Sequence, residues 1–326
     1  MVMKEQMNNT KKRGILIATC LAIVVIISLI AVFVYNRTKI NAGAADVPVP
    51  EGITPVTWDV SEDHLMIESD EARALYERIK ANDYPTLDEL VNDPVVKELD
   101  ALSAYYGQLY GDTSTIDTPE REQLRADVLK QFLSHGSARE VSVSDDGRKS
   151  YEYDGPLAYE YKAVIVLGLP ASGKSTIADP YSEELSAFNF DSDLIKEMLP
   201  EYQESHGAAA SSVHQESRNI QDMAVREFLE GDMKGCNVII QTIGNDLDAI
   251  HRRYIDPFED AGYNVKIVLV PAEVNESLAR AVMRGLRTGR IIPSSSIIGY
   301  GKDPENVYNT LAKQLNSCGE PYAYQE

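Results

Sequence analysis

A glycine-rich segment of the chain has the residue types and spacing of a phosphate-binding loop. It follows an apolar run and fits the pattern G-x-x-x-x-G-K-[ST] at every fixed position. Its glycines let successive backbone N–H groups turn toward an anion, and the start of the next helix adds its positive end. We expect ATP to bind at the following residues: Gly168, Leu169, Pro170, Ala171, Ser172, Gly173, Lys174, Ser175 and Thr176.

Two side chains of this loop have separate expected tasks. The Lys174 ammonium is expected to reach the β- and γ-phosphates, and the Ser175 hydroxyl to ligate Mg²⁺. The alternative is a plain glycine-rich turn between a strand and a helix. The full match in a strand–loop–helix context favours the nucleotide site.

Two acidic residues, Asp191 and Asp193, come directly after the apolar segment Ala187–Phe190. Carboxylates at the carboxyl end of a parallel strand face the same crevice as the phosphate loop. One such carboxylate can accept the proton of an attacking hydroxyl, and we predict that Asp193 is this base. Asp191 is predicted to line the substrate site, with an N-cap of the next helix as the alternative.

Arginines recur at helical spacing in the last quarter of the chain. Arg280, Arg284 and Arg287 share one face of a predicted helix. Arg290 follows in the segment TGRIIP, which is typical of a lid. Arginine stabilises the spread negative charge of a transferring phosphoryl group, and we predict this role for Arg290 above all. A solvated face paired with acidic residues is the alternative for Arg280 and Arg287.

Apolar segments alternate with helical patterns from residue 140 onward. Short apolar strands separated by helices predict an α/β fold of the P-loop NTPase type, with a mostly parallel sheet flanked by helices. The predicted strands are Ala163–Leu167, Ala187–Phe190, Asn237–Gln241 and Asn264–Val270. The predicted helices are Ser175–Leu185, Ser212–Glu230, Leu247–Ala261, Val274–Arg287 and Glu305–Leu315.

The segment before this alternation is predicted to be a small helical region. Its helical patterns are SDEARALYERIK, TLDELVNDPVVKELDALSAYYGQLY and TPEREQLRADVLKQFLSHG. A hairpin that turns at Asp146-Gly147 is predicted to follow. We interpret the acidic faces of these helices as solvated and assign no chemistry to them.

An uncharged stretch of 22 residues, 14–35, lies near the start of the sequence. As a helix it would span ~33 Å, the thickness of a bilayer core, and we predict a transmembrane helix. A cleaved signal peptide is the alternative, with a small-residue site around Ala44, but the stretch exceeds a signal core and Arg37 and Lys39 interrupt it. The predicted organisation is a tail (1–13), the transmembrane helix (14–35), a linker (36–60), the helical region (61–139) and the α/β domain (140–326).

Charge gives two further expectations. The formal charge of −20 argues against nucleic acid as a partner, because a phosphate backbone requires a basic surface. Lysine and arginine are more frequent before the span than directly after it, which favours a cytoplasmic N-terminus. A phosphate loop requires cytosolic ATP, however, and we expect residues 36–326 on the cytoplasmic side of a single-pass cell-membrane protein.

Five blocks of the sequence, in their order and spacing, resemble the zeta-toxin family of P-loop kinases. They are GLPASGKS, FDSD, VHQESRNI, GCNVIIQT and RAVMRGLRTGRIIP, and the resemblance covers about residues 161–315. It implies a kinase that phosphorylates the sugar 3′-hydroxyl of UDP-N-acetylglucosamine and that an antitoxin restrains. The implied cofactors are ATP and Mg²⁺.

The resemblance also implies roles by position. Asp193 matches the catalytic base, and Glu216 matches an acid that binds the substrate. Arg284 and Arg290 match two arginines that embrace the phosphates, and Lys174 completes the catalytic set.

Two positions depart from the family pattern. A strand that usually ends in an acidic residue before Gly-Thr ends here in Gln241, and a usual His-Pro pair is Leu199-Pro200. Gln241 is predicted to contact the acceptor through hydrogen bonds, without a full charge. A second function therefore stays open, namely a catalytically impaired, membrane-anchored regulatory module that binds ATP.

Overall fold

The computed structural model describes residues 64–134, 138–143, 149–153 and 156–315, all of which lie in one compact unit, Val49–Glu326. The predicted transmembrane helix (14–35) and the turn of the predicted hairpin lie outside the described residues. Within the described ranges, no helix is long and apolar enough to cross a membrane.

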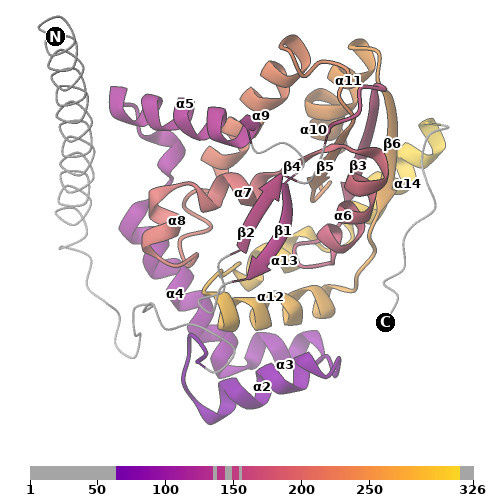
Figure 1. Cartoon of the computed structure of the whole chain (residues 1–326). Coiled ribbons are helices and arrows are strands. Elements are labelled where there is room, and N and C mark those ends of the chain that lie inside the picture. The colour runs from indigo at the N-terminus through magenta and orange to yellow at the C-terminus, as the bar shows by residue number, and fades with distance from the viewer. Residues whose placement is uncertain (1–63, 135–137, 144–148, 154–155, 316–326) are drawn as a thin grey trace, which may run out of the picture. The chain divides into compact units, whose positions relative to one another are not determined.

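A parallel sheet lies at the centre of the structure, with helices on both of its faces (Figure 1). The strands run in the order β4-β5-β3-β6, with these bounds: β3 (Lys162–Leu167), β4 (Phe188–Asp191), β5 (Val238–Thr242) and β6 (Asn264–Leu269). The register pairs Gln241 of β5 with Asp191 on one side and with Val166 of β3 on the other. These strands therefore end together. The predicted α/β fold with a parallel sheet is confirmed, and each strand end agrees with its prediction to within one residue.

Helices precede the sheet and connect its strands. Those before it are α2 (Asp70–Lys80), α3 (Leu87–Asn92), α4 (Pro94–Tyr110), the 3₁₀ turn η1 (Thr113–Thr115) and α5 (Pro119–Ser134). Those from β3 onward are α6 (Lys174–Leu185), α7 (Ser192–Glu197), α8 (Pro200–Glu204), α9 (His214–Glu230), α10 (Leu247–Ile250), the π-helical turn η2 (His251–Ile255), α11 (Asp256–Asp260), α12 (Val274–Thr288), α13 (Ser294–Tyr300) and α14 (Asp303–Gln314).

Strand β3 is buried on both faces, as its uninterrupted apolar run requires. Ala163, Ile165 and Leu167 belong to a large core shared with α5, α9, α11 and α14. Val164 and Val166 face the other way and pack with residues of α6. The loop that follows β3 is thus anchored from both sides of the sheet.

The predicted helix Leu247–Ala261 is interrupted. Its middle is the π-helical turn η2, in which the N–H of Asp256 donates to the carbonyl of His251, five residues back. Pro257 explains the change, because proline has no N–H to donate and its ring clashes with the carbonyl four residues earlier. The other predicted helices of the α/β part are confirmed, with ends displaced by at most two residues.

Capping side chains determine where the helices of the N-terminal region begin and end. The Ser69 hydroxyl accepts from the N–H of Ala72 at 3.0 Å and starts α2. The helical pattern TLDELVNDPVVKELDALSAYYGQLY forms two helices, α3 and α4. Asp93 ends α3 and caps α4, and Pro94 occupies the first turn of α4, where its missing N–H costs nothing.

The hairpin predicted after the helical region is also present. Strands β1 (Ala138–Val143) and β2 (Lys149–Tyr153) pair antiparallel, with an irregularity between Glu140 and Ser142.

The helical region packs onto the α/β part through two groups of helices. Helices α2, α3 and α4 pack against α12, and Figure 1 shows α2 and α3 beside it. Helix α5 lies elsewhere and inserts Phe132 into the core. The Phe132 ring meets Phe188 and Phe190 of β4 edge-on, with ring centroids 5.7 and 5.5 Å apart.

Candidate active site

The predicted phosphate-binding loop joins β3 to α6 and turns tightly. A Cβ on Gly168 would lie 2.7 Å from the Ser172 hydroxyl oxygen and 2.8 Å from the carbonyl oxygen of Val270. Only glycine fits such a close approach. Gly173 has a left-handed φ of 94° and leads directly into α6. The loop therefore places a helix N-terminus at the carboxyl end of the sheet, where an anion is favoured.

Lys174 folds back over this loop. Its Nζ donates to the carbonyl oxygens of Gly168 at 2.9 Å and Leu169 at 2.7 Å. Burial lowers the pKa of Lys174 to about 8, against the opposing influence of Asp193 and Asp191. The ammonium thus lies among the charged residues of the site, and its predicted contact with the β- and γ-phosphates stays a prediction.

The Asp193 carboxylate lies between two cations. One oxygen accepts from Lys196 Nζ at 3.2 Å, and the other pairs with the Arg290 guanidinium. Burial alone would raise the pKa of Asp193, but Arg290 and Lys196 outweigh it and hold the pKa well below its usual range. Asp193 is therefore ionised and can accept a proton once a cation is drawn away from it.

Asp191 has the geometry of a helix N-cap, the alternative to its predicted substrate contact. Its Oδ1 accepts from the backbone N–H of Asp193 at 2.9 Å, so it caps α7. Burial and the neighbouring Asp193 charge raise the pKa of Asp191. Its substrate contact stays a prediction.

Both predicted phosphate-binding arginines reach this place. Burial, followed by the nearby charge of Arg290, lowers the pKa of Arg284 to about 10. The Nε atoms of Arg284 and Arg290 are buried without a hydrogen-bond partner, and so is the hydroxyl of Ser172. Buried donors are normally paired, and an anion with several oxygens would supply what they lack. These orphan donors fit the phosphates of a nucleotide.

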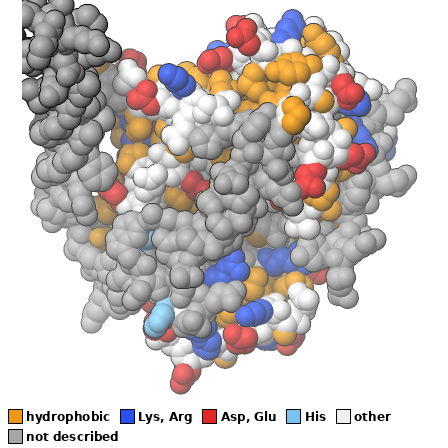
Figure 2. All heavy atoms as spheres, viewed as in Figure 1, with side chains coloured by type: hydrophobic (Ala, Val, Ile, Leu, Met, Phe, Trp, Pro, Cys, Tyr) orange, Lys and Arg blue, Asp and Glu red, His pale blue; other side chains and the backbone are white. Residues whose placement is uncertain are grey.

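Arg280 does not join this group. Its guanidinium stacks on the Tyr84 ring, 5.0 Å from the ring centroid, and contacts Glu276 at 3.4 Å. It follows the alternative predicted for it, a surface contact of α12. Figure 2 shows lysine and arginine side chains gathered on the face in view over α12, despite the acidic charge of the whole chain.

The predicted Mg²⁺ ligand, Ser175, is held by Gln241. Its hydroxyl donates to Gln241 Oε1 at 3.2 Å, and Gln241 Nε2 donates to Asn189 Oδ1 at 3.2 Å. In the described part of the chain, no group of three or more His, Cys, Asp or Glu side chains could hold a metal ion. Mg²⁺ fits as an ion held by Ser175 together with phosphate oxygens of the nucleotide.

Two residues beside the predicted base, Lys196 and His214, are not among the sequence-predicted site residues. Lys196 is 8 % exposed and stands three residues after Asp193, one turn along α7. His214, at the start of α9, is uncharged at neutral pH, because burial and the charges of Lys196 and Arg218 lower its pKa to about 3. The signal for Lys196 was its helical spacing from Asp193; no signal pointed to His214.

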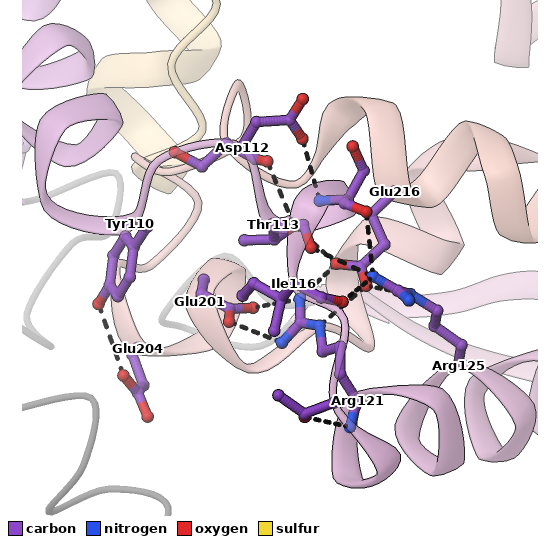
Figure 3. Close-up of polar contacts among 12 residues, drawn as sticks. Tyr110, Asp112, Thr113, Ile116, Arg121, Arg125, Glu201, Glu204 and Glu216 are labelled. Atoms are coloured by element: carbon purple, nitrogen blue, oxygen red, sulfur yellow. Dashed lines mark hydrogen bonds and ion pairs between the residues drawn. The ribbon is translucent and has the colours of Figure 1, made fainter.

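Glu216 has a different role from the predicted substrate contact. Its carboxylate is fully buried and is taken up by Arg121, Arg125 and Thr113, all from the N-terminal helical region (Figure 3). Thr113 Oγ1 donates at 2.6 Å, and the Nε atoms of both arginines donate at 2.8 Å. A substrate that accepts the phosphoryl group could contact Glu216 only if these hydrogen bonds broke. We therefore assign Glu216 a structural role.

Several solved structures match parts of this chain at low similarity. The chromosomal PezAT toxin–antitoxin system of Streptococcus pneumoniae is 15% identical, with a TM-score of 0.46, over 64% of this chain and 78% of that one. The complex AvrRxo1-ORF1:-ORF2 with ATP is 18% identical, with a TM-score of 0.45, over 69% and 67%. Deoxyadenosine kinase from M. mycoides with bound dATP is 14% identical, with a TM-score of 0.33, over 50% and 90%.

The family comparison is more specific than these likenesses. No curated protein matches the chain. The family model described as zeta toxin matches residues 157–316, a range that contains the phosphate loop, both aspartates and both arginines of the site. The chain is thus similar to the zeta toxin family over this range, which is just under half of its length.

Proposed function

We propose that the protein is a kinase that transfers the γ-phosphoryl group of ATP to a hydroxyl group of a small molecule. One juxtaposition carries the proposal. The Lys174 phosphate loop follows β3 and the ionised Asp193 follows β4, at the same edge of the sheet and on either side of β5. The Arg290 guanidinium pairs with Asp193, and its charge also acts on Lys174. A site that only bound nucleotide would have no need of a carboxylate held by two cations beside the phosphates.

The charges of the site suit a magnesium nucleotide. Four cations converge on it, and two carboxylates, Asp191 and Asp193, offset half of their charge. The cations are Lys174, Lys196, Arg284 and Arg290. The net charge of about +2 complements the charge of about −2 on a Mg²⁺–ATP complex. Nucleotide binding would thus neutralise the net charge of the site.

The residues divide the reaction between them. Asp193 accepts the proton of the acceptor hydroxyl while the hydroxyl oxygen bonds to the γ-phosphorus and the bond to the β–γ bridging oxygen breaks. Arg284 and Arg290 stabilise the charge spread over the phosphoryl oxygens, and Lys174 binds the phosphates that leave as ADP. Bound Mg²⁺ supplies further neutralisation of phosphate charge beside Ser175.

The resemblance to the zeta-toxin family makes UDP-N-acetylglucosamine our leading acceptor. Gln241, where an acidic residue is usual, retains hydrogen-bonding capacity through its contacts with Ser175 and Asn189. We also propose an antitoxin partner on the same ground. Membrane attachment through residues 14–35, with the kinase domain on the cytoplasmic side, completes the proposal.

Mass spectrometry tests the proposed reaction. The full chain is incubated with γ-¹⁸O-labelled ATP and UDP-N-acetylglucosamine, and in parallel with a small-metabolite extract. We expect a labelled product heavier by one phosphoryl group, and none from Lys174→Ala. Nucleotide binding without a labelled product from either mixture would contradict the kinase and support the regulatory module.

A further inference from the structure

A cluster of buried ion pairs joins α5 to α8 and α9 (Figure 3). We call it the clasp, and its members are Arg121, Arg125, Glu201 and Glu216. The two terminal nitrogens of Arg121 donate to the carboxylate of Glu201 at 2.7 and 3.1 Å, while its Nε donates to Glu216 at 2.8 Å. Arg125 donates to the same Glu216 oxygen at 2.8 Å. One guanidinium thus binds two helices at once.

Three of the four clasp residues are buried, and the clasp is balanced in charge. Arg121 is 8 % exposed, Glu201 4 % and Glu216 0 %, whereas Arg125 is 20% exposed; two cations face two anions. Removing one member would leave a buried charge without its partner, so the set is costly to open. Both arginines precede residue 157 and therefore lie outside the range that the zeta toxin family model matches.

Further hydrogen bonds extend the clasp along the chain between α8 and α9. The Thr113 N–H donates to the carbonyl of Ser212 at 3.2 Å, and the Ser212 hydroxyl donates to the carbonyl of Tyr106 at 3.4 Å. Tyr110 contacts Glu204 of α8 at 3.5 Å. The segment 201–216 is therefore held at both ends by the N-terminal helical region.

This held segment, residues 201–216, supports the catalytic arginine. Gly207 has a left-handed φ of 90°, and a Cβ on it would lie 2.9 Å from the Cα atom of Arg290. The backbone of Arg290 thus rests directly on the held segment, and its guanidinium reaches Asp193. Helix α9, which the segment enters, also packs against α7, where Asp193 stands.

We propose that Arg121 is a positioning residue for phosphoryl transfer, which fixes the held segment through Glu201 and Glu216 and thereby aligns Arg290 with Asp193. This inference rests on the proposed kinase function. Transfer rates respond steeply to alignment, since a displacement of ~1 Å can cost about 100-fold. The phosphate loop joins β3 to α6, which contribute no member of the clasp, so binding of ADP, which lacks the transferred phosphoryl group, should not depend on the clasp.

The experiment separates alignment from nucleotide binding. The affinity of the full chain for Mg²⁺–ADP is measured by calorimetry with and without aluminium fluoride, which mimics the transferring phosphoryl group. Arg121→Lys preserves the charge balance but cannot bind both glutamates in the same geometry. Arg78→Lys is the matched control, because Arg78 forms an exposed pair with Asp83 in the same helical region.

We expect Arg121→Lys to bind Mg²⁺–ADP within about threefold of the wild-type affinity and to lose ~10–100-fold of the tightening by aluminium fluoride. Arg78→Lys should match the wild type. The positioning role would be overturned if aluminium fluoride tightened Mg²⁺–ADP binding by Arg121→Lys as much as in the wild type, or more. It would also be overturned if the variant lost the same factor of affinity with and without aluminium fluoride. No tightening in the wild type would instead refute the kinase on which it rests.

A second variant covers a failure of Arg121→Lys to fold. Thr113→Val removes one donor to Glu216 and leaves every charge of the clasp paired. It should reduce the fluoride-dependent tightening several-fold without changing the affinity for Mg²⁺–ADP. Unchanged tightening in a folded Thr113→Val protein would overturn the proposal equally.

Discussion

Replacing Asp193 by asparagine should change turnover and nucleotide affinity in opposite directions. The variant retains the shape of the side chain but removes the proton acceptor, so we expect the turnover number to fall by ~10²–10⁴-fold. The same change removes one of two negative charges that offset four cations. The nucleotide phosphates then meet a more positive site and should bind more tightly.

The size of the expected gain in Mg²⁺–ATP affinity depends on how exposed the Asp193 side chain is. Two unit charges 4 Å apart interact by about 1 kcal/mol in water and about 4 kcal/mol at an effective dielectric constant of 20. The Asp193 side chain is 31% exposed, so we take the lower figure and expect roughly fivefold tighter binding of Mg²⁺–ATP. The same substitution should lower the free energy of unfolding, because Lys196 and Arg290 lose their ion-pair partner. Exposed pairs contribute about 0–1 kcal/mol and buried ones 3–5 kcal/mol, which places the loss near ~2 kcal/mol.

Three measurements on the full chain check this prediction. Calorimetry gives the Mg²⁺–ATP affinity, product formation gives the turnover number, and thermal unfolding gives the stability. Asp83→Asn is the control, because Asp83 also pairs with an arginine but lies on the surface far from the phosphate loop in sequence. Turnover within tenfold of the wild type would refute the base, and loss of nucleotide binding would show that Asp193 binds ATP instead.

Three more predictions concern the loop, the amide and the core. Because the pKa of Lys174 is lowered to about 8, its positive charge is present below that pH and lost above it. Titration calorimetry should therefore show the Mg²⁺–ATP affinity of the wild type falling ~10-fold from pH 7 to pH 9, whereas that of Lys174→Arg should stay level. Gln241→Glu places a carboxylate beside Ser175, and we expect tighter Mg²⁺ binding with equal or greater transfer to UDP-N-acetylglucosamine; loss of transfer in a product assay would show that the site suits another acceptor. Phe132→Ala should lower the free energy of unfolding by ~3–5 kcal/mol in urea titrations, and a loss below about 1 kcal/mol would contradict the placement of α5 in the core.

Local patterns predicted the parts of the site that follow directly from strand ends. The phosphate loop, Asp193 and the spacing of Arg284 are set by short-range rules, since a buried strand must be followed by a turn and parallel strands end at one edge. The break at Asp93-Pro94 follows from similar local rules, because aspartate favours the N-cap and proline the first turn of a helix. Pro257 is the sequence signal for the π-helical turn. Its effect depends on the register of the surrounding helix, so the turn could not be predicted from the proline alone.

The contacts of Glu216 could not be predicted from its neighbours in sequence. Arg121 and Arg125 lie some 90 residues away and read as ordinary members of a charged, solvated helix face. Their burial depends on the tertiary placement of α5, which the core contact of Phe132 sets. Periodicity identifies a helix and its apolar stripe, but not the partner of each charge on it.

The packing of Phe132 on β4 has a consequence for how the chain is made. Helix α5 leaves the ribosome before its aromatic partners exist, since roughly sixty residues separate Phe132 from Phe190 and synthesis adds about 5–20 residues per second. Its apolar stripe must therefore wait for ~3–12 s before it can be covered. During that interval the nascent chain is a natural client for chaperones, and substitutions that make α5 more apolar should reduce the yield of soluble protein even where they stabilise the finished fold.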